Sequence, residues 1–176
     1  HGQVLCGVTG GDGRAETQRL LRDRFADPDA LVIDVSPSYL LQAGLPYARS
    51  KMAIILDANL TGVPPRYQEE ERAIKLVNVL ADAVERDGMV VCPAKAWEIQ
   101  DYARDSGCRI AVFATDDDVT QRDSRRARAV GRVRDGRILI EGCSEEDAGP
   151  LDPALPACSQ VAAALAHATF SSECLT

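Results

Sequence analysis

The chain has 176 residues, 27 acidic and 20 basic side chains, a formal net charge of -7 and a hydrophobic content of 45%. This length corresponds to about one domain at ~100–200 residues each, so separate modules for several substrates are not expected. The acidic balance disfavours nucleic-acid binding, which needs a basic face, and no apolar run approaches the ~20 residues that span a bilayer.

Short apolar runs alternate with helical patterns along the first two thirds of the chain. Their spacing predicts a strand at 4–8, a helix at 14–25, strands at 30–35 and 52–56, a helix at 68–86, a strand at 89–92, a helix at 95–105 and a strand at 109–114. Continuous apolar strands such as 52–56 are typical of parallel sheets that are covered on both faces. We therefore expect an α/β domain of three layers, with a mostly parallel sheet and helices on both faces.

The pattern changes in the last third of the chain. Two runs at 129–134 and 137–141 flank Asp135-Gly136, a two-residue hairpin signal, and predict an antiparallel hairpin at one edge of the sheet. Residues 142–158 contain Gly, Pro and acidic side chains and are expected to form an irregular acidic link. The apolar spacing of residues 160–170 predicts a terminal helix.

A glycine-rich turn, residues 9–15 (the glycine loop), connects the first strand to the first helix. Such a turn points backbone N–H groups and the positive end of a helix at an anion, and is therefore a candidate phosphate site. In an ATP loop, a Lys and a Ser or Thr are expected where Arg14 and Ala15 stand; Arg keeps the charge in a bulkier form, and Ala offers magnesium no oxygen. The candidate binding residues are Thr9, Gly10, Gly11, Asp12, Gly13, Arg14 and Ala15.

Two other interpretations of the glycine loop remain open, together with one of a separate segment. A dinucleotide site would use Gly7, Gly10 and Gly13, with Asp34 on the ribose, although Glu16 would then face the pyrophosphate. The turn can also be a strand-to-helix connection without a ligand. A third pattern is the Tyr-x-x-x-Lys of residues 47–51, which matches short-chain dehydrogenases but comes too soon after the second strand.

The glycine loop resembles the ATP loop of the Mur ligase central domain, and the chain is similar to the Mur-ligase-like part of cyanophycin synthetase. Residues 34–41, 44–56, 83–91 and 160–170 are similar to further segments of that family. The resemblance implies a P-loop-type fold, ATP and Mg²⁺ as cofactors, flanking domains, and ATP-dependent joining of a carboxylate to an amine. It places Asp34 in a segment that helps to hold magnesium.

The chain also departs from the family pattern. The family has an Asp-His pair after the third strand, but residues 57–62 contain no His. The family's Asn-Ala-Asp-Asp after the next strand corresponds to Pro93-Ala94-Lys95-Ala96, and its metal-helping lysine has Lys75 as the nearby candidate, about two residues out of register. Asp34 alone remains as a metal ligand, and one carboxylate makes a poor magnesium site.

We therefore expect a degenerate, inactive Mur-ligase-like module with a structural, assembly or ligand-binding role. The alternative is an active ATP-dependent amide ligase domain, and a weaker alternative is an NAD(P)-binding module. Residues 1–176 begin with His-Gly and are expected to form one domain of a longer chain, whose flanking domains are its partners. A homo-oligomer is compatible with this view, whereas nucleic acid and membrane are not expected as partners. The six cysteines contain no CxxC pair, which favours reduced thiols in a cytoplasmic protein over a metal site.

Charge is distributed unevenly along the chain. Residues 141–176 carry six carboxylates and no Lys or Arg. The preceding segment is rich in arginine, with Arg122, Arg125, Arg126, Arg128, Arg132, Arg134 and Arg137. These cations predict either a solvated edge that blocks strand-to-strand aggregation or a docking surface for an acidic partner or for the chain's own acidic tail.

Overall fold

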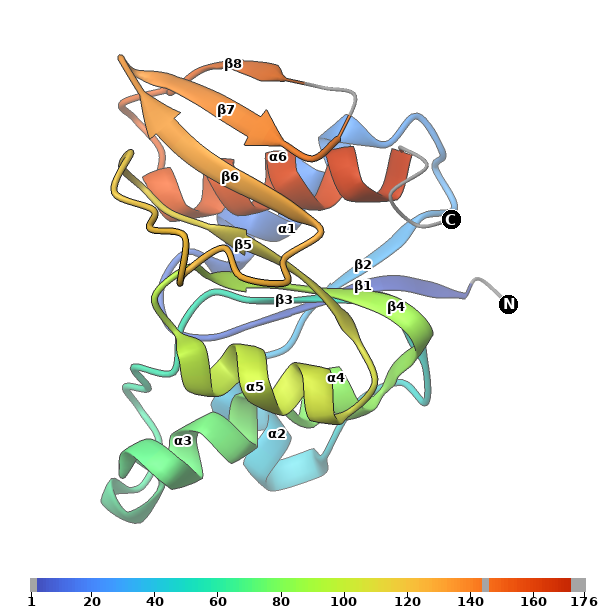
Figure 1. The fold of residues 1–176 in the computed structure, drawn as a ribbon. Coiled ribbons are helices and arrows are strands. Elements are labelled where there is room, and N and C mark those ends of the chain that lie inside the picture. The colour runs from blue at the N-terminus through green and yellow to red at the C-terminus, as the bar shows by residue number, and fades with distance from the viewer. Residues whose placement is uncertain (1–2, 144–145, 172–176) are drawn as a thin grey trace.

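The computed structural model describes residues 3–143 and 146–171, and one eight-stranded sheet in the order β2-β1-β3-β4-β5-β6-β7-β8 runs through it (Figure 1). The strands are β1 (Val4–Thr9), β2 (Leu31–Asp34), β3 (Ser50–Ile55), β4 (Val84–Pro93), β5 (Arg109–Phe113), β6 (Ala129–Arg134), β7 (Arg137–Glu141) and β8 (Asp147–Pro150). The helices are α1 (Arg14–Arg24), α2 (Pro37–Ala43), the short 3-10 helix η1 (Pro65–Tyr67), α3 (Glu70–Val77), α4 (Val79–Asp82), α5 (Trp97–Asp105) and α6 (Ala157–Ser171). Neighbouring strands from β2 to β6 pair in parallel, which confirms the predicted mostly parallel sheet.

Helices cover both faces of the sheet, as predicted (Figure 1). On one face, α1 and α6 pack over a core that includes Met52 and Ile54 of β3. On the other face, α2, α3, α4 and α5 pack over a core that includes Ala53 and Ile55. Successive side chains of a strand point to opposite faces, so β3 must be apolar throughout to fill both cores.

The predicted antiparallel hairpin forms at the far edge of the sheet. β6 and β7 pair in antiparallel register, and Asp135 and Gly136 both have positive φ, at 52° and 70°, as a tight hairpin turn requires. The prediction of an irregular link at 142–158 is wrong in part, because Asp147–Pro150 pairs with β7 as the edge strand β8. This strand shows no apolar alternation because it is a short outer edge. Residues 144–145 of that link lie outside the described residues.

The predicted helix at 68–86 is also wrong in its extent. It breaks at Asn78, which is buried and whose side-chain amide donates to the Ile74 carbonyl at 2.9 Å, dividing the segment into α3 and α4. Val84 then begins β4 opposite Ser50, and residues 85–88 bulge out before Met89 pairs with Met52. The apolar residues keep a helical spacing up to Val84, although Val84 itself lies in a strand. The sheet provides Val84 with backbone partners that the sequence pattern does not reveal.

The carboxyl ends of the parallel strands meet at one edge of the sheet. The glycine loop follows β1, Asp34 ends β2, Asp57 follows β3, and Lys95 follows β4. Open α/β sheets bind ligands at this edge, so a functional site is expected here. No helix within residues 3–143 and 146–171 has the length and apolarity to cross a membrane.

Candidate functional site

The glycine loop adopts the strand–turn–helix geometry that the sequence predicts. β1 ends at Thr9, and α1 begins at Arg14 directly after Gly13. Gly10 and Gly13 have φ of +121° and +92°, values that side-chain-bearing residues rarely adopt. The turn therefore depends on glycine at both positions.

The Arg14 side chain fills the inside of this turn. Its Nη1 group donates to the carbonyl oxygens of Gly10 and Gly11, at 2.8 and 2.9 Å. Its Nε group donates to Oδ1 of Asp34, also at 2.9 Å, in an ion pair whose two side chains are 26% and 29% exposed. The turn thus presents carbonyl groups to its own guanidinium and ties the first two strands together at their carboxyl ends.

The Asp57 side chain is also hydrogen-bonded to the glycine loop. Its Oδ1 accepts hydrogen bonds from the backbone N–H of Gly11 at 3.0 Å and of Asn59 at 3.1 Å. A backbone N–H in such a turn is the group that a bound phosphate uses. A carboxylate of the chain therefore already takes a place that an incoming anion would need.

The C-terminal helix α6 packs against the turn at Gly13. Ser159 is buried, and its hydroxyl donates to the Gly13 carbonyl at 2.8 Å, while Thr17 donates to the same oxygen at 2.7 Å. A Cβ at Gly13 would lie 2.6 Å from the Ser159 oxygen. Thr9 is fully buried, whereas Asp12 and Ala15 are exposed. Of the seven candidate residues, Gly10, Gly11, Gly13 and Arg14 are thus engaged by neighbouring side chains or carbonyls.

These residues do not fit a magnesium nucleotide. The Gly11 N–H is bonded to Asp57, Asp34 is paired with Arg14, and Ala15 offers no oxygen. Among the described residues, no group of three or more His, Cys, Asp or Glu side chains is placed to hold a metal ion. Lys75, the nearby candidate for the family's lysine, lies on α3 and pairs with Glu71 at 2.9 Å.

The other sequence interpretations find similar obstacles. The Asp34 carboxylate, which a dinucleotide site would place on a ribose, is bonded to Arg14. Tyr47 packs against Gly7, where an added Cβ would meet its ring, and burial raises the pKa of Tyr47. Proton transfer by a tyrosine needs the opposite change, because only a lowered pKa makes it an effective base near neutrality.

Six of the seven arginines in the arginine-rich segment divide into two groups. Arg132 pairs with Asp117 and Glu141, Arg134 with Asp117, and Arg137 with Asp147. Glu141 and Asp147 belong to the acidic tail, so this tail does pair with the sheet edge at two points. Arg122, Arg125 and Arg126 instead line a cavity beside α5. The sequence pattern indicated the cations but not the cavity. The available signal was Trp97, an aromatic side chain on which an arginine can stack.

We expect Arg14→Met to lower the free energy of unfolding by about 2 kcal/mol. The change keeps much of the side-chain volume but removes three charge-assisted hydrogen bonds from a partly exposed site. Urea denaturation measures the effect. Arg19→Met on the exposed face of the same helix is the control and is expected to cost less than about 0.5 kcal/mol. Equal losses in the two variants would contradict a stabilising role for Arg14 within the loop.

Comparisons with known proteins identify the fold. No protein-family model matches the sequence, and no curated protein matches it. Among solved structures, MurF from Acinetobacter baumannii superposes with a TM-score of 0.62 at 11% identity, over 97% of this chain and 43% of that chain. The MurF ligase from Thermotoga maritima, solved in complex with ADP, superposes with a TM-score of 0.58 at 11% identity, over 93% of this chain and 44% of that one. The chain thus has a Mur-ligase-like fold and spans less than half the length of these structures.

Proposed function

We propose that this chain is a degenerate, catalytically inactive Mur-ligase-like module of a longer protein of the cyanophycin-synthetase type. Its role would be structural, in assembly, or in binding a ligand away from the glycine loop. One observation supports this most strongly: the side chains of Arg14 and Asp57 are already hydrogen-bonded to the backbone groups of the glycine loop. A module with such a loop keeps the fold of a nucleotide-binding domain without its phosphate site.

The energy needed to open the loop supports this proposal. A nucleotide phosphate would have to displace Asp57 from the Gly11 N–H and Arg14 from the two loop carbonyls. A charge-assisted hydrogen bond contributes roughly 1.5–3 kcal/mol, so losing even two costs roughly 3–6 kcal/mol. This is comparable to the whole binding free energy of a millimolar ligand, about 4 kcal/mol. The carboxylates of Asp34 and Asp57 would also repel the phosphates.

The likeness to longer proteins suggests the setting of this module. Residues 1–176 cover 43% of the A. baumannii MurF chain, so the remaining domains of a ligase have no counterpart here. We propose that flanking domains of a longer cytoplasmic protein, or further copies of the chain, are its partners. The module would then contribute a rigid α/β body to that assembly.

An active ATP-dependent amide ligase domain is the second candidate. It is favoured by the likeness to the T. maritima MurF ligase, whose structure contains ADP. In this case ATP and Mg²⁺ would have to rearrange Arg14 and Asp57 on binding. The two candidates therefore differ in whether the loop opens for a nucleotide.

Stability in the presence of Mg-ATP separates these candidates. A ligand at 100 times its dissociation constant adds about 2.7 kcal/mol to the free energy of unfolding. We expect no such gain from Mg-ATP at about 5 mM, and no release of ADP over time. The measurement is best made with Arg125 and Arg126 replaced by Gln, so that exposed cations elsewhere do not bind the phosphates. A gain that disappears on Arg14→Met, which removes the cation standing where an ATP loop has its Lys, or steady ADP release, would favour the ligase.

A further inference from the structure

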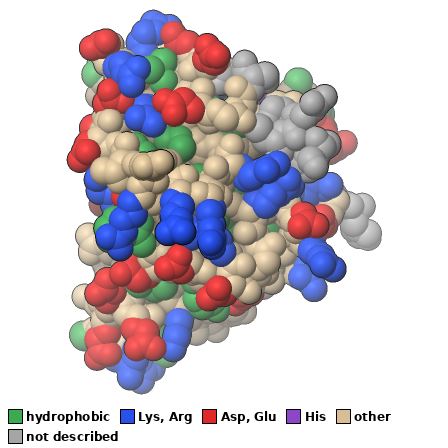
Figure 2. Space-filling view, viewed as in Figure 1, with side chains coloured by type: hydrophobic (Ala, Val, Ile, Leu, Met, Phe, Trp, Pro, Cys, Tyr) green, Lys and Arg blue, Asp and Glu red, His purple; other side chains and the backbone are tan. Residues whose placement is uncertain are grey.

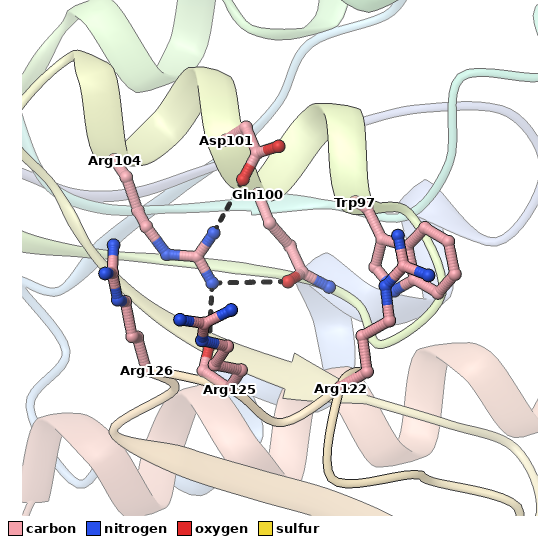
Figure 3. Close-up of a pocket in the computed structure, with 7 residues that line it drawn as sticks. All are labelled: Trp97, Gln100, Asp101, Arg104, Arg122, Arg125 and Arg126. Atoms are coloured by element: carbon pink, nitrogen blue, oxygen red, sulfur yellow. Dashed lines mark hydrogen bonds and ion pairs between the residues drawn. The ribbon is translucent and has the colours of Figure 1, made fainter.

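A cavity of about 250 Å³ lies between α5 and the segment that connects β5 to β6 (Figure 3). Four arginines line it, Arg104 from α5 and Arg122, Arg125 and Arg126 from the connecting segment, together with Trp97 and Asp101. We call it the arginine cavity. Four arginines against one aspartate give its lining a formal excess of three positive charges. In a chain of net charge -7, this is a local reversal of sign.

Three of these arginines have no acidic partner in the part of the chain that the structure describes. Within residues 3–143 and 146–171, no carboxylate forms an ion pair with Arg122, Arg125 or Arg126, although Arg132, Arg134 and Arg137 each have one. Figure 2 shows Lys and Arg side chains gathered across the middle of this face, with Asp and Glu side chains above and below them. Like charges held together repel each other, and a bound anion relieves that repulsion.

Buried contacts hold the frame of the cavity in place. Asp123 is 1% exposed, and its carboxylate accepts hydrogen bonds from Trp97 Nε1 at 3.0 Å and from the Thr120 N–H at 2.9 Å. The Arg122 guanidinium lies over the Trp97 ring, 3.7 Å from its centre. These contacts fix the connecting segment against α5, so little ordering remains to be done when a ligand binds.

Arg104 reinforces the same frame from the opposite side. Its Nη2 group donates to the Arg125 carbonyl at 2.8 Å, and its Nη1 group pairs with Asp101 at 2.9 Å (Figure 3). Arg126 is held with φ at +61°, a conformation that costs energy outside glycine. The side chains of Arg125 and Arg126 are exposed, and their guanidinium groups are available to a ligand.

We propose that the arginine cavity binds the phosphoryl group of a small molecule. Planar guanidinium forks match phosphate oxygens in pairs, and a phosphoryl group offers three oxygens and close to two negative charges to several arginines at once. The volume of about 250 Å³ lies just below the roughly 300–1,000 Å³ of sites for drug-sized ligands, so it suits a phosphate or a small phosphate ester.

A nucleic acid fits this surface less well. An extended polyanion needs a continuous basic face, because each phosphate along the strand must be neutralised. Here the acidic side chains of Asp101, Asp116, Asp117 and Asp118 lie on the cavity rim or along the same connecting segment. Acidic side chains therefore interrupt the basic surface next to the cavity, which suits a single phosphoryl group better than an extended strand.

The fluorescence of Trp97 provides a direct test, because it is the only tryptophan in the chain. Inorganic phosphate and glycerol 3-phosphate are titrated separately at constant ionic strength, up to about 10 mM, and calorimetry measures the same binding. We expect saturable binding of at least one of them. Tighter binding of phosphate would identify the free ion as the ligand, and tighter binding of the ester would identify a phosphorylated metabolite.

Matched variants locate the binding. Arg125→Gln combined with Arg126→Gln is expected to weaken binding at least about tenfold, because each lost charge-assisted contact is worth about a decade. The control, Arg49→Gln combined with Arg86→Gln, removes the same charge from two exposed positions outside the cavity and is expected to change affinity less than about twofold. Circular dichroism verifies that both variants fold.

Three results would overturn the proposal. The first is no saturable binding of either phosphate compound. The second is equal weakening in both double variants, which would show a general charge effect rather than a site. The third is much tighter binding of an oligonucleotide of about ten residues than of either compound, weakened by the same arginine substitutions. This result would assign the surface to nucleic acid.

Discussion

Gly10→Ala is expected to lower the free energy of unfolding by about 3 kcal/mol. The glycine has φ of +121°, which costs a side-chain-bearing residue roughly 1–2 kcal/mol. The added Cβ would also lie 2.9 Å from the backbone nitrogen of Asp57, and a backbone atom cannot rotate away. Relieving that contact would separate the loop from Asp57 and disturb the Gly11 hydrogen bond. Urea denaturation followed by circular dichroism measures the loss.

Gly149→Ala is the matched control for backbone strain. Gly149 has φ of +104°, but no atom lies within 4 Å of the position that its Cβ would occupy. The control therefore introduces comparable strain without a collision, and is expected to cost about 1 kcal/mol. If the two variants lost the same stability, the close packing of the glycine loop against Asp57 would be contradicted.

Asp123→Ala is expected to lower the free energy of unfolding by about 3 kcal/mol. The buried carboxylate accepts hydrogen bonds from Trp97 Nε1, the Thr120 N–H and Lys95 Nζ. Its removal leaves the first two donors without an acceptor. Release of the segment between β5 and β6 should also expose Trp97 to water and therefore red-shift its emission. Denaturation and fluorescence together measure both effects.

Asp118→Ala is the control, because Asp118 also pairs with Lys95 at 3.3 Å but is 73% exposed. Exposed ion pairs contribute little, so the expected loss is below about 1 kcal/mol. A loss equal to that of Asp123→Ala would show that the pair with Lys95, rather than the buried hydrogen bonds, stabilises the segment.

The contribution of Asp123 should also depend on pH. Hydrogen bonding, above all from the Thr120 backbone, lowers the pKa of Asp123 from 3.8 to about 2. Because the folded-state pKa lies below the unfolded one, the stabilisation is fully present above the unfolded value and is lost as pH falls from about 4 towards 2. The difference in stability between the native chain and Asp123→Ala should shrink over this range. A difference that stays constant from pH 6 to about 2 would contradict the lowered pKa.

Much of the fold could be predicted from local pattern. The uniform apolarity of β3 indicated a sheet covered on both faces, and Asp135-Gly136 located the hairpin. The extent of the helix at 68–86 could not be predicted, because Val84 enters the sheet through pairing with Ser50, 34 positions earlier in the chain. The helix α2 was missed although it has local signals: Pro37 lies in its first turn, and the Ser36 side chain accepts from the Tyr39 N–H.

The candidate site was predictable only in part. Glycine spacing located the loop, and the identity of Arg14 indicated that a lysine-dependent phosphate site was altered. The pairing of Arg14 with Asp34 and of Gly11 with Asp57 depends on strands that meet only in the folded chain. The clustering of Arg122, Arg125 and Arg126 was visible in the sequence, but the contribution of Arg104 and Trp97 from α5 was not. Contacts between distant segments decide both sites, and local patterns do not encode them.

The backbone amide of Gly11 provides the most direct test of whether Arg14 and Asp57 keep a nucleotide out of the glycine loop, which we call closed for that reason. Its N–H is bonded to the Asp57 carboxylate, and its nuclear magnetic resonance signal reports any group that replaces Asp57. Mg-ATP is titrated into the variant with Arg125→Gln and Arg126→Gln, which removes two cations of the arginine cavity. If the loop is closed by its own side chains, the Gly11 and Gly13 amide signals stay in place up to about 10 mM nucleotide. A saturable shift of the Gly11 amide, with loss of its protection from hydrogen exchange, would contradict the closed loop and favour a working nucleotide site.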